Sequence, residues 1–381
     1  MGNADNVLFD NDSRVAPLGL IAMAGASELG KKVDGYLTKW ANENEFVKDT
    51  FLGEAVCPRF SSGDGKGLIK SSIRGDDLFI LCDVGNYSCT YNYFGRENSM
   101  SPDDHYQDLK RIIQAAGGKA HRINIIMPSL YGGRQHRRNY RESLDCAVAL
   151  QELQSMGVSN ILTFDAHDPR VQNAVPLMGL DNIIPSYQVL KAMFKNLSDF
   201  RPDKDHFMII SPDEGAINRN MYYASVLGVN LGMFYKRRDY STIIDGRNPI
   251  VAHEYMGNDV AGKDVFIADD IISSGESMLD IAVELKKRKA NKIYCYATYP
   301  IFTNGLEAFN KAYADGIIDG VFGTNLTYRT PELLSSPWFY EVDCSKYIAY
   351  FIASLNHDKS ISQVIDPHTK IEALLKKYGI K

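Results

Sequence analysis

The sequence predicts an α/β protein whose parallel sheets are covered by helices. Short apolar runs alternate with amphipathic stretches along most of the 381 residues, and this rhythm restarts after residue 205. Such alternation is typical of parallel sheets built from βαβ units. Polar clusters follow several of the predicted strands. Because ligands of open α/β sheets bind beyond the carboxyl ends of the strands, these clusters predict a functional site.

In the first half of the chain, apolar runs predict strands over residues 18–25, 76–85, 122–130 and 160–167. Amphipathic stretches over 26–40, 105–118 and 142–157 predict the helices between them. Residues 86–104, "NYSCTYNYFGRENSMSPDD", interrupt this rhythm and are predicted to form a loop insertion.

The second half repeats the pattern, with predicted strands over 206–215, 230–238, 263–270 and 292–302 and helices over 216–228 and 277–290. The stretch from 175 to 205 reads as a crossover, so we predict two domains, over 1–178 and 179–381. Residues 237–262 are long, polar and turn-rich, which predicts a closing loop. The chain ends in a predicted short basic helix.

The composition argues against several classes of protein. The net charge is −5, which disfavours a general nucleic-acid or anionic-membrane surface. The six cysteines form no CxxC pair and no zinc-ligand spacing, and the polar, acidic start is unlike a secretory signal. No apolar run approaches the roughly 20 residues of a membrane span. We therefore expect a cytoplasmic protein with neither nucleic acid nor membrane as partner.

The stretch "DVFIADDIISSGES", residues 264–277, ends an apolar run in two acids and a small-residue turn. Backbone N–H groups of such a turn, and of the helix that follows, bind phosphate oxygens. Asp269 and Asp270 would repel a phosphate, so they are predicted either to accept hydrogen bonds from sugar hydroxyls or to bind a magnesium ion. The alternative is an ordinary acidic turn in which Ser277 caps the next helix.

Two further clusters follow strands in the first half. "GGRQHRR", residues 132–138, places three arginines within five residues, and guanidinium groups can bind polyphosphate oxygens bidentately. The alternative is a solvated basic loop. In "TFDAHDPRVQ", residues 163–172, a histidine stands two residues after an aspartate at a strand end, which makes His167 a candidate metal ligand. The alternative is a structural histidine.

These motifs, in this order, resemble those of the ribose-phosphate pyrophosphokinase family. The loop over 264–277 also resembles the phosphoribosyl-diphosphate loop of type I phosphoribosyltransferases, so this loop alone does not separate the two families. "GGRQHRRNYRES" resembles the pyrophosphokinase signature Arg-Gln-Asp-Arg-Lys, with His136 in place of the aspartate. The resemblance implies two tandem type I phosphoribosyltransferase-like domains, each a mainly parallel sheet flanked by helices.

The resemblance also implies an ATP site in the first domain, made by Phe60, Asp64, Arg134, Gln135 and Arg137. "FSSGDGKG", residues 60–67, resembles the family turn that contacts the nucleotide from a neighbouring subunit, with Ser62 in place of the usual Asn or Asp. A homo-oligomer with a shared nucleotide site is therefore implied. The alternative for Phe60 is packing in the core.

For the second domain, the resemblance implies the catalytic, sugar-phosphate and metal contacts. Lys236 and Arg238 match the family's catalytic Lys-x-Arg pair. "SPDEG", residues 211–215, matches a segment beside the ribose phosphate or its metal. The implied ribose 5-phosphate contacts are Asp213, Asp269, Asp270, Ser273, Ser274, Gly275 and Ser277. The implied cofactor is Mg²⁺, held by His167, Asp165 and Asp213.

The implied activity is transfer of the diphosphoryl group of ATP to the 1-hydroxyl of ribose 5-phosphate, which gives AMP and 5-phospho-α-D-ribosyl 1-diphosphate for nucleotide biosynthesis. Ser273-Ser274-Gly275 favours a phosphoribosyltransferase as the alternative, because the pyrophosphokinases usually have an aspartate where Ser273 stands. A second alternative is a non-catalytic regulatory protein that associates with a true synthetase, motivated by the departures at Ser62, His136 and Ser273.

Overall fold

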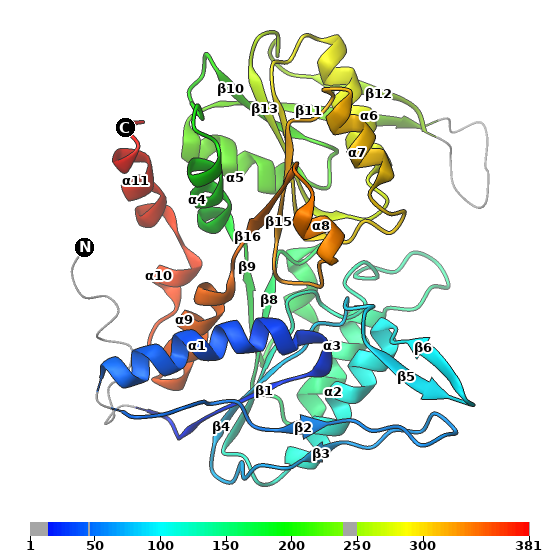
Figure 1. The fold of residues 1–381 in the computed structure, drawn as a ribbon, viewed down its shortest axis with the longest axis vertical. Helices are drawn as coiled ribbons and strands as arrows, with labels where there is room; N and C mark the ends of the chain where they lie inside the picture. The colour runs from blue at the N-terminus through cyan, green and yellow to red at the C-terminus, as the bar shows by residue number, and fades with distance from the viewer. Residues whose placement is uncertain (1–13, 45, 239–249, 381) are drawn as a thin grey trace. The chain divides into compact units, whose positions relative to one another are not determined.

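The computed structural model describes residues 14–44, 46–238 and 250–380, and these form two compact units (Figure 1). The first contains the residues up to 185 together with 325–328 and 343–366; the second contains 186–324, 329–342 and the residues after 366. The chain thus passes between the units five times, after residues 185, 324, 328, 342 and 366. A single domain boundary at 178/179 stays a prediction, and the structural units are discontinuous in sequence.

The first unit is built on a five-stranded sheet in which all neighbouring strands are parallel. In spatial order the strands are β1 (Leu18–Ala22), β4 (Asp77–Leu81), β7 (Arg122–Ile126), β8 (Asn160–Phe164) and β9 (Gly179–Ile183). The helices are α1 (Ser27–Glu43), α2 (Pro102–Ala116), α3 (Asp145–Ser155), α9 (Ser345–Asn356) and α10 (Ser362–Ile365), with short 3-10 turns η2 (Ala24–Ala26) and η3 (Pro169–Ala174).

Helices cover both faces of this sheet, as a parallel sheet requires. Ile80 and Ile125 pack on one face in a core shared with α2 and α3. On the other face, Phe164 of β8 meets Tyr347 of α9 at 6.4 Å between ring centroids. Helices α1 and α9 lie side by side and pack through Trp40 and its partner ring on α9 (Figure 1).

Two hairpins extend from the first unit beside α2 (Figure 1). One joins β2 (Ala55–Val56) to β3 (Leu68–Ile69), and the other joins β5 (Thr90–Tyr93) to β6 (Arg96–Ser99). The second hairpin occupies the segment 86–104 that was predicted as a loop, so that prediction was wrong. Thr90, Tyr91 and Tyr93 are residue types that favour strands, and this segment satisfies its backbone groups by antiparallel pairing across a short turn.

The second unit is built on a seven-stranded sheet, parallel except for its edge pair β12–β11. In spatial order the strands are β12 (Ile250–Met256), β11 (Asn230–Arg238), β10 (Phe207–Ser211), β13 (Asp264–Ile272), β14 (Ile293–Pro300), β15 (Gly320–Thr324) and β16 (Phe339–Val342). The helices are α4 (Ser186–Asn196), α5 (Ile217–Leu227), α6 (Glu276–Lys287), α7 (Glu307–Ala314), α8 (Pro331–Ser335) and α11 (His368–Lys377).

Apolar side chains alternate between the two faces of this sheet as well. Ile267 and Cys295 belong to a core with α6, α7 and α8. Phe266, next to Ile267 in sequence, faces Tyr223 of α5 on the opposite side, at 5.6 Å between ring centroids. This period of two is what a sheet covered on both sides produces.

The predicted strands and helices are present, with ends that shift by a few residues. The predicted closing loop over 237–262 is shorter than expected, because 250–256 form β12 and pair antiparallel with β11. Residues 239–249 lie outside the described residues. No helix in the described part of the chain combines the length and apolar character needed to cross a membrane.

Strands β4 and β7 begin with an ion pair at the amino-terminal edge of the first sheet. Arg122 donates to both carboxylate oxygens of Asp77, from Nε at 2.8 Å and from Nη2 at 2.7 Å. Asn124 donates to Asp77 Oδ1 at 2.7 Å, and Asn356 of α9 donates to Oδ2 at 3.0 Å. Arg122 also donates to the Leu355 carbonyl at 2.8 Å. This fully buried carboxylate therefore ties the end of α9 to the sheet.

We predict that Asp77→Ala lowers the free energy of unfolding by about 3–5 kcal/mol, because largely buried Arg122 and Asn124 would lose their acceptor. Asp358→Asn is the control: Asp358 also contacts Arg122, at 3.3 Å, but its side chain is 73% exposed, and asparagine tolerates the φ of +46° at this position. This substitution should cost less than about 1 kcal/mol. Urea denaturation of the three proteins measures both values, and equal losses in the two variants would contradict the anchoring role of Asp77.

Candidate active site

The acid pair lies at the carboxyl end of β13 in the second unit. Asp269 and Asp270 are consecutive in the strand, and their carboxyl groups interact with each other. Asp269 Oδ1 accepts a hydrogen bond from the Asp270 backbone N–H at 2.8 Å. Arg219 Nη1 lies 3.5 Å from the same oxygen. One carboxylate of the pair therefore has a guanidinium neighbour.

Burial, and then the neighbouring Asp270 carboxylate, raise the pKa of Asp269 to about 8, although Arg219 opposes this shift. Asp213 adds a smaller repulsion of the same sign. Asp269 and Asp270 thus form a group of carboxylates that repel each other. Such a group favours hydroxyl donors or a cation as ligand, because either relieves the repulsion between the carboxylates.

Helix α5 holds the acid pair in position through a residue that the sequence analysis did not select. Asn220 is fully buried, and its Nδ2 donates at 2.8 Å to the carbonyl of Ala268, directly before Asp269. The same amide donates to the Ala216 carbonyl at the start of α5. Asn220 shares its buried helix face with Tyr223 and Leu227. A polar residue within an apolar stripe was the available signal for Asn220.

The turn after β13 has the geometry of an anion-binding loop. Gly275 adopts φ +82° as the N-cap of α6, and a β-carbon there would lie 2.3 Å from the ring of Phe309. Only glycine fits this position without displacing the core. Helix α6 begins at Glu276, which places Ser277 inside its first turn. The alternative in which Ser277 caps the helix is therefore wrong, since Gly275 stands at the cap.

The other turn residues support the loop itself. Ser273 accepts a backbone hydrogen bond from Thr303 at 2.9 Å, and Ser274 Oγ accepts one from the Glu276 N–H at 3.5 Å. The N–H groups at the start of α6 and the hydroxyls of this turn thus lie on one short segment directly after the acid pair. This is the arrangement that a sugar phosphate requires, with acceptors for hydroxyls followed by donors for phosphate.

Strand β10 is shorter than β11 and β13, its two neighbours in the sheet. Strand β10 ends at Ser211, which pairs with Met233, whereas β11 continues to Arg238. On the other side, β13 continues five residues beyond Ile267, the last of its residues that pairs with β10. The loop with Asp213 therefore follows a strand end flanked by both longer neighbours. Asp213 Oδ1 accepts a hydrogen bond from the Ala216 N–H at 3.1 Å, which closes this turn.

Lys236 and Arg238 lie in the carboxyl-terminal part of β11, where the backbone pairs antiparallel with β12. Lys236 pairs with His253 and Arg238 with Ile250, and the register shifts between Arg237 and Arg238. The sheet order places β11 next to β10, and β10 next to β13. The predicted catalytic pair and the acid pair are thus on strands that flank the same short strand.

In the first unit, the arginine loop and the Asp–His segment follow the neighbouring strands β7 and β8. Gln135 Nε2 donates to the carbonyls of Arg137 at 3.2 Å and Ser143 at 2.9 Å, so this amide holds the loop in shape. Arg134 and Arg137 are exposed. Their guanidinium groups are available to a polyanion from solvent, as either the polyphosphate site or the basic-loop alternative requires.

His136 lies beside the predicted metal ligand His167, with ring centroids 5.3 Å apart. His136 Nε2 is 3.4 Å from Asp168 Oδ2. Burial lowers the pKa of His136, with His167 and Arg137 contributing in the same direction against Asp168. Asp165 is buried with φ +43°, an uncommon conformation for a residue other than glycine. Within the described residues, no group of three or more acidic, histidine or cysteine side chains forms a ready-made metal cage.

Phe60 and Asp64 lie on the turn between β2 and β3. The Phe60 ring is 57% exposed, so the alternative of core packing is wrong. The Ser62 hydroxyl donates to Asp64 Oδ2 at 2.7 Å. The Ser62 hydroxyl is therefore engaged with Asp64. Its side chain is shorter than the Asn or Asp that the family resemblance implies at this position.

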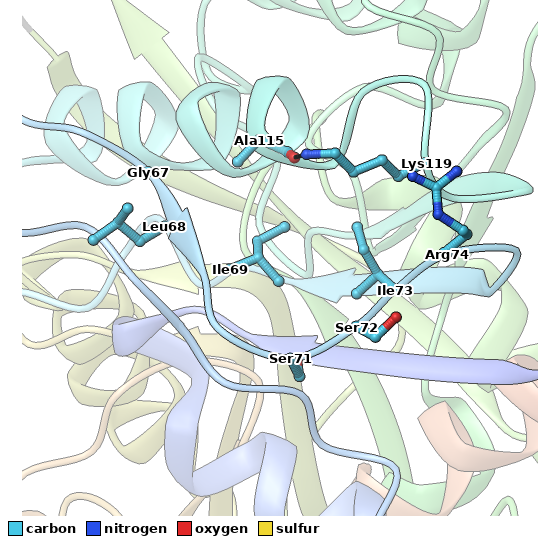
Figure 2. A pocket seen from close by; sticks show the side chains of 9 residues that line it. All are labelled: Gly67, Leu68, Ile69, Ser71, Ser72, Ile73, Arg74, Ala115 and Lys119. Atoms are coloured by element: carbon cyan, nitrogen blue, oxygen red, sulfur yellow. Dashed lines mark hydrogen bonds between the residues drawn. The ribbon is translucent and has the colours of Figure 1, made fainter.

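A cavity of about 410 Å³ lies near the same hairpin. Residues 67–69 and 71–74, the end of α2 at Ala115, and Lys119 line it. Figure 2 shows the Lys119 side chain extending toward Ala115, with Arg74 near Ile73. None of the predicted site residues lines this cavity. It is therefore separate from the candidate site.

Two family models match the chain in sequence order. Residues 18–157 match the N-terminal domain of ribose phosphate pyrophosphokinase, and residues 180–316 match the phosphoribosyl transferase domain. The ribose-phosphate pyrophosphokinase of Shewanella oneidensis is 29% identical over 317 residues, which are 82% of this chain and 90% of that protein. That of Vibrio cholerae is 27% identical over 321 residues, which are 83% and 92% of the two chains.

A solved structure shares the fold. The phosphoribosylpyrophosphate synthetase of Mycobacterium smegmatis is 20% identical, covers 90% of this chain and 99% of its own, and superimposes with a TM-score of 0.70. This likeness confirms the predicted fold of two tandem phosphoribosyltransferase-like domains with mainly parallel sheets flanked by helices.

The raised pKa of Asp269 predicts how stability depends on pH. Its ordinary value is 3.8, so between about pH 4 and pH 8 the folded state binds more protons than the unfolded state, and stability falls as pH rises. Asp269→Asn removes this loss. The melting temperature of the variant should rise relative to wild type from about pH 5 to pH 8 and then stay constant, in buffers with a chelator.

Asp280→Asn, on the exposed face of α6, is the control for loss of one carboxylate. Its melting temperature should follow wild type at every pH. A constant difference between Asp269→Asn and wild type across this range would show that the folded and unfolded states titrate alike, against the prediction.

Proposed function

The chain belongs to the ribose-phosphate pyrophosphokinase family, and we propose that it transfers the diphosphoryl group of ATP to the 1-hydroxyl of ribose 5-phosphate. The products are 5-phospho-α-D-ribosyl 1-diphosphate and AMP, and the former feeds nucleotide biosynthesis. The sugar-phosphate loop at the end of β13 supports both candidate reactions, so the observation that carries this proposal is the match of residues 18–157 to the N-terminal domain of ribose phosphate pyrophosphokinase.

The geometry of that loop fits ribose 5-phosphate in two parts. Asp269 and Asp270 accept hydrogen bonds from the ribose hydroxyls, which relieves the repulsion that raises the pKa of Asp269. Ser273, Ser274, Gly275 and Ser277 bind the 5-phosphate through hydroxyls and backbone N–H groups at the helix start. Asp213, in the loop after the short strand β10, lies beside the same sugar.

The reaction is an in-line displacement at phosphorus. The ribose 1-hydroxyl oxygen forms a bond to the β-phosphorus of ATP and releases its proton to water. The bond from that phosphorus to the bridging α,β oxygen breaks, and AMP leaves with the electron pair. Charge grows on oxygens that are already anionic, so positioning and cationic stabilisation supply most of the catalysis. We assign this stabilisation to Lys236 and Arg238, at the end of β11.

The first unit supplies the nucleotide contacts in this proposal. Arg134 and Arg137, both exposed, bind the triphosphate, and Gln135 holds their loop. Phe60 and Asp64, on the β2–β3 turn, contact the nucleoside. The exposed Phe60 ring supports this role, because a base can stack on it.

Magnesium is the proposed cofactor. The proposed ligands are His167 and Asp165 in the first unit and Asp213 in the second, and a bound Mg²⁺ would supply positive charge to phosphate oxygens. The described residues contain no complete cage, which fits an ion that takes most of its ligands from substrate phosphates and water. Asp165 and Asp213 offer the oxygen donors that Mg²⁺ prefers.

A phosphoribosyltransferase is the second candidate, favoured by Ser273-Ser274-Gly275 and by the match of residues 180–316 to the phosphoribosyl transferase domain. Both reactions use the same sugar-phosphate loop. They differ in the second substrate, which is ATP for the pyrophosphokinase and a nucleobase for the transferase.

We further propose a cytoplasmic homo-oligomer whose nucleotide site is shared between subunits, with the exposed Phe60 turn as the shared part. Light scattering of the purified protein should give a mass that is a multiple of the 42.6 kDa chain. A monomeric mass under assay conditions would contradict the shared site.

The purified protein with ATP, ribose 5-phosphate and Mg²⁺ should form AMP and the diphosphate sugar, as detected by mass spectrometry. Lys236→Ala should lower the rate by roughly 100-fold or more, because one cation that stabilises the transferring group is lost. Lys311→Ala, whose side chain is 78% exposed on α7, is the control and should keep the wild-type rate. Nucleobase-dependent consumption of the diphosphate sugar without ATP would instead support the transferase.

A further inference from the structure

We propose that the inserted hairpin β5–β6 is a positioning element for the nucleotide turn, defined as residues 58–66 between β2 and β3, and that Tyr93 is its principal contact. This inference rests on the proposed function, which gives Phe60 and Asp64 on that turn their role with the nucleotide. Figure 1 shows both hairpins reaching outward on the same side of α2.

The tips of the two hairpins are in direct contact. The Phe94 N–H donates to the Ser61 carbonyl at 3.0 Å. Gly63, with φ +94°, lies against the ring of Tyr93: a β-carbon at Gly63 would be 2.6 Å from Tyr93 Cδ2. The Tyr93 ring thus occupies the space next to Gly63. The hydrogen bond from Phe94 to Ser61 fixes the position of one hairpin tip against the other.

One face of β5 is directed at the nucleotide turn and its base. Tyr91 and Tyr93 are two residues apart in the strand and therefore share a face. The Arg59 guanidinium lies 5.1 Å from the Tyr91 ring centroid. Arg59 in turn donates to both carboxylate oxygens of Asp108 on α2, at 2.8 and 2.9 Å. The turn is therefore held at its tip by Tyr93 and at its base by α2.

The opposite face of the same hairpin makes a contact that does not involve the turn. The Thr90 hydroxyl donates to Glu97 Oε1 at 2.8 Å, and both residues are exposed. This contact stabilises β5 against β6 alone. It gives a matched control for the Tyr93 contact within one hairpin.

The turn presents its functional groups in one conformation. The Phe60 N–H donates to the Asp64 carbonyl at 2.7 Å, and the Gly63 N–H donates to the Phe60 carbonyl at 2.8 Å. The Phe60 ring nevertheless stays mostly exposed. A preorganised aromatic ring binds a base more tightly than a mobile one, because less conformational entropy is lost on binding. Bracing by Tyr93 therefore acts on nucleotide affinity.

The experiment measures equilibrium binding by calorimetry, with α,β-methylene ATP as a nucleotide that cannot be cleaved at the reacting bond, and separately with ribose 5-phosphate. Tyr93→Ala should weaken binding of the ATP analogue by about two- to tenfold, the range that an aromatic packing contact supports. Ribose 5-phosphate affinity should stay unchanged. Tyr93→Phe should restore the affinity for the ATP analogue, since the contact with Gly63 uses the ring.

Thr90→Ala should bind both ligands as wild type does. Unchanged affinity of Tyr93→Ala for the ATP analogue would overturn the inference, and so would equal losses for both ligands, which would indicate general destabilisation. The proposed function has its own test, because it fails if the wild type forms no AMP from ATP and ribose 5-phosphate. The binding experiment does not require turnover, so the two failures are distinguishable.

Discussion

The first unit depends on a single buried carboxylate. Asp77 stands at the first position of β4, accepts four hydrogen bonds, and neutralises Arg122 at the first position of the neighbouring strand β7. Burying a charge without its partners would be strongly destabilising, so the whole cluster has to form together. Its polar groups are satisfied at the amino-terminal edge of the sheet. The carboxyl-terminal edge carries the arginine loop and the Asp–His segment, whose Arg134, Arg137 and His167 are exposed.

In the second unit, by contrast, the repulsion between carboxylates is not fully neutralised by partners. Asp269 and Asp270 repel each other at the end of β13, Asp213 adds to that repulsion, and Arg219 only partly offsets it. The rigid support comes from uncharged contacts: Asn220 bonds to the carbonyl before the acids, and Gly275 fits against Phe309 after them. The strand is thus fixed on both sides of a group that is electrostatically unfavourable on its own. The repulsion between the carboxylates lowers the stability of the protein without ligand. A ligand that relieves this repulsion would raise the stability again.

Much of this architecture could be predicted from local sequence, because buried parallel strands are apolar runs and the amphipathic helices have a clear period. Strand β11 was predicted with both of its observed ends. The acid pair, the Gly275 turn and the Asp–His segment were also identifiable, since each follows such a run.

Long-range contacts could not be predicted from local sequence. Nothing in the letters around Asn356 indicates that it bonds to Asp77, and the aromatic residues of 86–104 gave no sign of pairing, because hairpin register depends on the turn and on neighbours distant in sequence. Asn220 was missed for a related reason, since its partner carbonyl lies 48 residues further along the chain.

The discontinuity of the two units has a consequence for synthesis on the ribosome. Strands β4 and β7 emerge early, but the amide that completes the coordination of Asp77 belongs to Asn356, 279 residues later. Helix α9, which covers one face of the first sheet beside α1, is made last among the major helices of that unit. The nascent first unit must therefore wait with an exposed apolar face and an incomplete polar cluster until nearly all of the chain has been translated. Domains generally fold as units in the order of their synthesis, and a chain of this design departs from that order. The segments after residue 324 thus set the moment at which the amino-terminal half can finish folding.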